Sequence, residues 1–136
     1  MRALLRFIAI VATTLAIGLG ASAAFSGAPA LTDQQKLWLA FHVPHLAPPP
    51  LISCLDHFES GNDYAFPLDG RPPNGYEGAG QWLHSTWSAA AQRSGWGVFA
   101  SWPVGAVPAG VQDQVMWYWG THDGWGQWGT HWRCGV

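Results

Sequence analysis

The feature that most constrains the fold is a pair of cysteines. Cys54 and Cys134 are the only two in a chain of 136 residues, and they lie about 80 positions apart. In an oxidising compartment two such cysteines are expected to form a disulfide. It would close a long loop and stabilise the fold by roughly 4–5 kcal/mol on the chain-entropy model. A metal site is the alternative, but there is no C-x-x-C motif to support one.

The N-terminal segment, residues 1–23, has the organisation of a secretory signal peptide. Arg2 and Arg6 form a basic start, residues 7–19 are uncharged and apolar, and residues 21–23 read Ala-Ser-Ala, as a cleavage site does. A retained membrane anchor is the alternative, because no charge follows until Asp33. The apolar run is, however, shorter than the ~20 residues of a spanning helix. We therefore expect cleavage near Ala24 and an exported protein.

The composition excludes several classes of protein. Charged residues make up 10% of the chain and hydrophobic residues 49%, with 10 Trp and 17 Gly. So low a charge with so many aromatics is not typical of disordered or coiled-coil chains. Lys and Arg total 6 and occur singly, whereas binding nucleic acid takes a basic cluster. We expect no nucleic-acid partner.

Local patterns divide the rest into two parts. Residues 24–50 hold a linker, a helix that opens on a Thr32–Gln35 capping box and ends before Pro44, and a Pro-rich spacer. Residues 51–136 form one domain. In it we predict helices at 51–60, 82–93 and 111–119, hairpin signals at 69–70 and 74–75, a loop at 98–110 and an irregular tail at 124–134. The prediction is an α+β fold, mainly helical with a short β-hairpin region.

Glu59 is the most informative acidic residue. It comes at the end of an apolar helix, after Phe58 and before Ser60-Gly61. A partly desolvated carboxyl in such surroundings suits a general acid. A solvated Glu at the helix C-terminus is the alternative, which the helix dipole disfavours.

Several short motifs occur in a fixed order around Glu59. They are Cys54, Glu59-Ser60-Gly61, Asn74-Gly75-Tyr76, Gln81-Trp82, Thr86-Trp87, Gly124-Trp125-Gly126-Gln127-Trp128 and Cys134. This order resembles that of the transglycosylase-like domain of bacterial resuscitation-promoting factors, over about residues 52–134.

The resemblance implies a small lysozyme-like domain that cleaves the bond between N-acetylmuramic acid and N-acetylglucosamine in peptidoglycan. It makes Glu59 the catalytic acid and places Tyr76, Gln81 and Thr86 in the sugar groove. Asp123 stands where the family often has Gln, just before Gly-Trp-Gly, and with Trp125 completes the expected substrate-binding set. The chain departs from the family in extra residues around 67–73 and in the aromatic run 117–119.

Other residues leave alternatives open. Glu77 would make a second carboxylate, as in a lysozyme-type hydrolase, or be a solvated hairpin residue, which we favour. Trp125 and Trp128 lie in a Gly-rich tail, where an exposed ring is as plausible as a core position. His42 and His45 flank Pro44, but no further ligand completes a metal site, so we read them as loop residues.

The expected function is that of a secreted, wall-associated lytic transglycosylase with a single Glu acid/base. We expect no metal, no cofactor and a monomer, with peptidoglycan glycan strands as its partner; whether it works with other wall hydrolases stays open. The alternatives are a binding module that holds wall glycan without cutting it, and a two-carboxylate hydrolase.

Overall fold

The computed structural model describes residues 30–66 and 75–136. The predicted signal peptide and the hairpin signal at 69–70 lie outside these residues. Over the described ranges the elements, in chain order, are α2 (Asp33–His42), α3 (Pro50–Ser60), β1 (Tyr76–Glu77), β2 (Trp82–Leu83), α4 (His84–Arg93), η1 (Gly97–Phe99), η2 (Val104–Ala106), α5 (Ala109–Asp123), η3 (Trp125–Gln127) and η4 (His131–Cys134).

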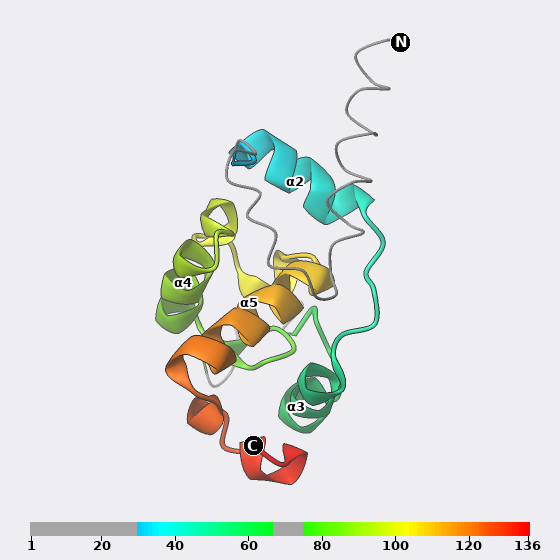
Figure 1. Ribbon diagram of the computed structural model, residues 1–136, viewed down its shortest axis with the longest axis vertical. Helices are drawn as coiled ribbons and strands as arrows, with labels where there is room; N and C mark the ends of the chain where they lie inside the picture. The colour runs from blue at the N-terminus through cyan, green and yellow to red at the C-terminus, as the bar shows by residue number, and fades with distance from the viewer. Residues whose placement is uncertain (1–29, 67–74) are drawn as a thin grey trace, which may run out of the picture. The chain divides into compact units, whose positions relative to one another are not determined.

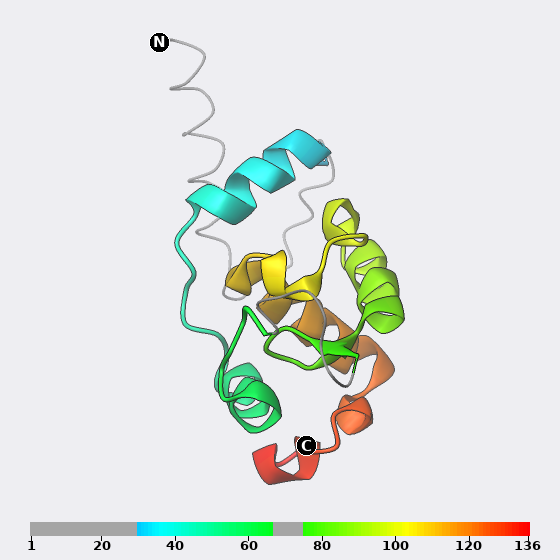
Figure 2. The ribbon, with the colours of Figure 1, turned by 180° about the vertical axis from the view of Figure 1, so that it is seen from behind.

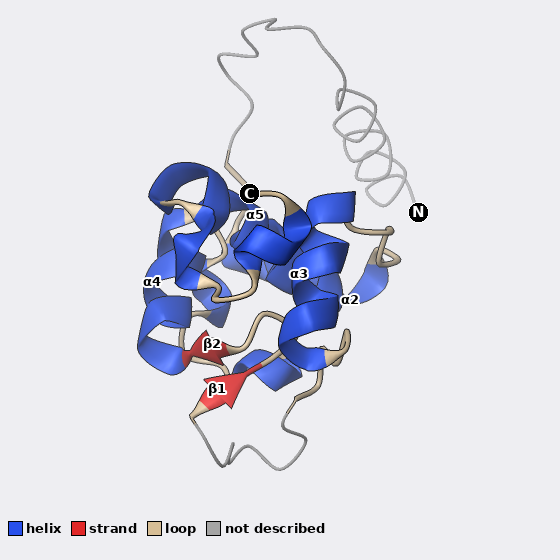
Figure 3. Ribbon diagram, turned by 90° about the horizontal axis from the view of Figure 1, so that it is seen from below, coloured by secondary structure: helices blue, strands red, loops and turns tan. Residues whose placement is uncertain are grey.

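The described domain is mostly helical and carries one small antiparallel sheet, which confirms the α+β prediction. Helix α5 runs through its middle, with α4 on one side and α3 on the other (Figure 1). The view from behind brings the sheet forward (Figure 2), and the view from below shows its two strands, in red, beside α4 (Figure 3). Within the described ranges no helix combines the length and apolar character that a bilayer-spanning segment requires.

Local signals explain where α2 and α3 begin and end. Thr32 caps α2 through a complete capping box with Gln35, as the sequence predicts. Helix α3 starts at Pro50, and it ends because Gly61 adopts a left-handed backbone (φ 70°) and returns its N–H to the last turn. The last turn of α3 therefore presents Glu59 at the point where the chain changes direction.

The hairpin differs from its prediction. Its strands pair Tyr76 with Leu83 and Glu77 with Trp82, so the turn between them is residues 78–81; the predicted signal at 74–75 begins outside the described residues. Trp82, predicted to begin a helix, belongs to β2, and α4 starts two residues later. Gly78 makes the turn possible: its φ is +68°, and a Cβ there would lie 2.5 Å from Gln112 Oε1.

Buried residues from all parts of the domain form one core. Helix α5 is longer than the predicted 111–119, and the predicted loop and tail contain short 3-10 helices. The largest fully buried side chains are those of Trp87, Phe99, Ile52, Leu55, Met116 and Gln112. Cys54 in α3 is bonded to Cys134 in η4, which confirms the predicted disulfide.

Candidate active site

A cavity of about 410 Å³ opens between the end of α3, the hairpin, the start of α4 and the tail. It is lined by Glu59, Tyr76, Gly80, Gln81, Trp82, Leu83, Thr86, Gln127, Trp128 and Gly129. Among these described lining residues, Glu59 is the one carboxylate. The four segments that supply the lining are those that carry the ordered sequence motifs.

Glu59 lies half-buried in the cavity wall, and a residue of the C-terminal tail hydrogen-bonds its carboxylate. The Thr130 hydroxyl donates a hydrogen bond to Glu59 Oε1 across 71 positions of sequence. A hydrogen bond to an ionised carboxylate is stronger than one between neutral groups. The acid is therefore both open to the cavity and fixed in orientation.

The hairpin contributes Tyr76 and Gln81. Tyr76 is 40% exposed and lines the cavity from β1. Gln81 has a left-handed backbone (φ 49°), which is uncommon for a residue with a side chain. Its side-chain amide donates to the Gly78 carbonyl at 3.3 Å within the same turn. Backbone strain of this kind gathers at functional sites. Thr86 completes this side of the cavity from the first turn of α4.

Two tryptophans, Trp82 and Trp128, contribute to the lining of the cavity. Trp82 and Trp128 are almost fully buried, and their rings meet edge to face at 5.3 Å. The Trp128 indole N–H donates to the Gly80 carbonyl at 2.9 Å, which joins the tail to the hairpin turn. Trp128 is therefore a core residue with one surface toward the cavity, and not the exposed ring that the Gly-rich tail allowed.

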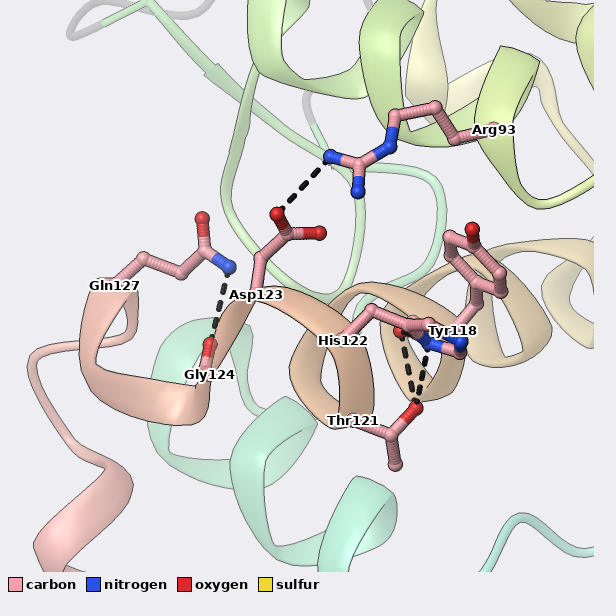
Figure 4. A network of polar contacts seen from close by, with 7 residues as sticks. All are labelled: Arg93, Tyr118, Thr121, His122, Asp123, Gly124 and Gln127. Carbon is pink, nitrogen blue, oxygen red and sulfur yellow. Dashed lines mark hydrogen bonds and ion pairs between the residues drawn. The ribbon is translucent and has the colours of Figure 1, made fainter.

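Asp123 and Trp125, predicted to bind substrate, lie outside the set that lines the cavity. The Asp123 carboxylate accepts a hydrogen bond from Arg93 of α4 at 3.0 Å (Figure 4). The Trp125 ring packs on Gly120, where a Cβ would lie 2.1 Å from it. Both residues hold the end of α5 in place.

Glu77 is not the solvated residue that the hairpin pattern predicts. Its side chain is only 13% exposed. Glu77 Oε2 accepts the Val104 backbone N–H at 2.6 Å, which caps η2, and Oε1 lies 3.7 Å from His84 Nδ1. It does not line the cavity, in keeping with the alternation of side chains along a strand. The Glu77 carboxylate thus joins β1 to the start of η2.

Sequence reasoning missed several residues of the site, among them Gly80 and Leu83 of the hairpin and three residues of the tail. Gln127 and Gly129 line the cavity, and Thr130 holds its acid. Gln127 occupies the variable position of the Gly-Trp-Gly-x-Trp motif, and its place in that motif could have indicated that it belongs to the site. Nothing local distinguishes Thr130, because its role depends on the disulfide bringing η4 to α3.

A group of polar side chains is buried away from the cavity. Asp56 and Asp113 are 1% and 6% exposed. The Tyr64 hydroxyl donates to Asp56 Oδ2 at 3.0 Å, and His45 Nε2 lies 2.6 Å from Asp113 Oδ2. His45 thus ties the linker before α3 to α5, and in the described ranges no three His, Cys, Asp or Glu side chains are gathered to hold a metal.

Burial, reinforced by the neighbouring Asp113 carboxylate, raises the pKa of Asp56 from 3.8 to about 7. The folded protein then binds more protons than the unfolded chain between pH 4 and 7, so the free energy of unfolding falls as pH rises through this window. The loss amounts to at most about 4 kcal/mol. Asp56→Asn imitates the protonated acid and is expected to flatten this slope.

Denaturant unfolding of both proteins at a series of pH values measures the effect. Asp33→Asn, at an exposed carboxylate in the first turn of α2, is the matched control and should keep the parental slope. Equal slopes for Asp56→Asn and the parent would contradict the prediction.

Comparisons with protein-family models, with curated proteins and with solved structures each found no match for this chain. The geometry of the cavity and the order of the motifs therefore carry the functional conclusion.

Proposed function

We propose that the protein is a secreted, lysozyme-like enzyme that cleaves peptidoglycan glycan strands as a lytic transglycosylase. The observation that carries this proposal is the convergence on one cavity of Glu59, Tyr76, Gln81 and Thr86. The resemblance to the transglycosylase-like family assigned each of these residues a role in the site. If the motifs had matched the family's order by chance, these four residues would not be expected to line the same cavity.

The proposed reaction uses one carboxyl group twice. Glu59 protonates the glycosidic oxygen, and the bond from that oxygen to C1 of the N-acetylmuramic acid breaks. The substrate's own N-acetyl oxygen stabilises the cationic C1. Glu59, now a carboxylate, takes the proton of the 6-hydroxyl, and O6 closes on C1 to give a 1,6-anhydro sugar. No water is consumed, and Glu59 ends protonated again.

The lining of the cavity supports this single-acid reaction over a two-carboxylate one. Glu77 was the candidate second carboxylate, and it is engaged with the Val104 amide outside the cavity. The cavity lining combines the aromatic rings of Trp82 and Trp128 with amide and hydroxyl side chains, and this combination suits a neutral sugar. Binding would rest on ring packing and hydrogen bonds, because the chain carries a formal charge of −2.

The mass of the product released from purified peptidoglycan tests the proposal. We expect muropeptides that carry a 1,6-anhydro end, lighter by one water than hydrolysed ones. Products with a reducing end would instead identify a hydrolase, for which a second carboxylate would have to be sought. Binding without any release of product would identify a glycan-binding module.

A further inference from the structure

We propose that Thr130 is a positioning residue for Glu59, and that it determines which carboxyl oxygen delivers the proton. This inference rests on the proposed function. Its basis is the hydrogen bond from the Thr130 hydroxyl to Glu59 Oε1. Among the described residues, Thr130 is the one side chain that hydrogen-bonds the Glu59 carboxylate.

The backbone on both sides of Thr130 is anchored. Two residues before it, Trp128 is buried and donates to Gly80 of the hairpin turn. Four residues after it, Cys134 is bonded to Cys54, five residues before Glu59 on the same helix. Between these anchors the chain turns tightly, with the Arg133 N–H on the Thr130 carbonyl at 2.9 Å. The hydroxyl is thus carried by a segment fixed to both walls of the cavity.

This arrangement has a chemical consequence. When Thr130 donates to Oε1, the acidic proton of Glu59 resides on Oε2, so a single oxygen faces the glycosidic bond. After proton transfer the same hydroxyl stabilises the carboxylate through a charge-assisted hydrogen bond. Orientation of the acid raises the rate of the chemical step, because it populates the reactive geometry before the substrate arrives.

Thr130→Val replaces the hydroxyl by a methyl group of the same shape. We expect kcat on solubilised glycan strands to fall by about 10- to 100-fold, the range for losing a hydrogen bond to a charged group. KM should stay within about twofold, since sugar contacts are unchanged. A fall in kcat at unchanged KM and unchanged free energy of unfolding distinguishes positioning of the acid from a purely structural role for Thr130.

Two further variants make the result specific. Thr130→Ser keeps the donor and should restore kcat to within about threefold of the parent. Thr121→Val is the matched control, because the Thr121 hydroxyl is engaged with α5 carbonyls away from the cavity; it should leave kcat unchanged. If Thr130→Val does not fold, Thr130→Ala is compared with Thr130→Ser in its place.

The outcomes separate this inference from the proposed function. If Glu59→Gln abolishes cleavage while Thr130→Val matches the parent in kcat, the positioning role is overturned and the proposed enzyme stands. If the parent itself releases no product, the proposed function fails first. If Thr130→Ser is as impaired as Thr130→Val, the hydroxyl is not the active group and the inference is also overturned.

Discussion

Glu59→Gln is expected to abolish peptidoglycan cleavage while leaving the fold and glycan binding intact. General acid–base catalysis contributes about 10²–10⁴ in rate, and the glycosidic oxygen is a poor leaving group without protonation. Glutamine cannot deliver that proton. Its amide oxygen can still accept the Thr130 hydroxyl, which in the parent donates to Glu59 Oε1. The local packing should therefore survive, and release of soluble muropeptides from purified peptidoglycan measures the loss.

Glu77→Gln is the matched control for this experiment. It makes the same chemical change at a carboxylate outside the cavity, and its amide oxygen can keep the hydrogen bond from the Val104 N–H. Activity should remain within about tenfold of the parent, since no acid–base step is removed. Loss of cleavage in both variants would favour a two-carboxylate hydrolase. Full activity in Glu59→Gln would refute the enzyme proposal.

The sequence predicted the elements whose ends carry strong local signals. The Thr32 capping box and the prolines before residue 51 fix the starts of α2 and α3, and each signal acts within a few residues. The disulfide was predictable because only two cysteines were available to pair. Motif order singled out Glu59, Tyr76, Gln81 and Thr86, and the fold brings all four to one cavity.

What the sequence did not reveal depends on contacts between distant segments. Trp82 lies in a strand because it pairs with Glu77 across the turn. The local helix propensity of residues 82–83 contains no information about that pairing. Asp123 accepts a hydrogen bond from Arg93, 30 positions away, and a motif position alone does not reveal that contact. Thr130 and the buried Asp56–Asp113 group are likewise defined only by the folded arrangement of α3, α5 and the tail.

Removal of the disulfide should produce the largest change in stability. The Cys54–Cys134 bond has a sequence separation of 80 residues. A cross-link of this span lowers the conformational entropy of the unfolded chain and raises its free energy by about 4 kcal/mol. In the double variant Cys54→Ser/Cys134→Ser we expect the free energy of unfolding to fall by about that amount. Urea unfolding of the oxidised parent and the double variant, both without reductant, measures the difference.

The double variant also separates stability from activity. The bond holds η4 against α3, and η4 follows directly on Thr130. Cleavage by the folded double variant should therefore fall even under conditions where it is fully native, because the tail that orients Glu59 loses its covalent anchor. Dithiothreitol should lower the stability and activity of the parent to those of the double variant, and should have no effect on the double variant itself. Equal stability of the parent and the double variant would mean that packing of the tail, through Trp128 and Gly80, fixes it without the cross-link.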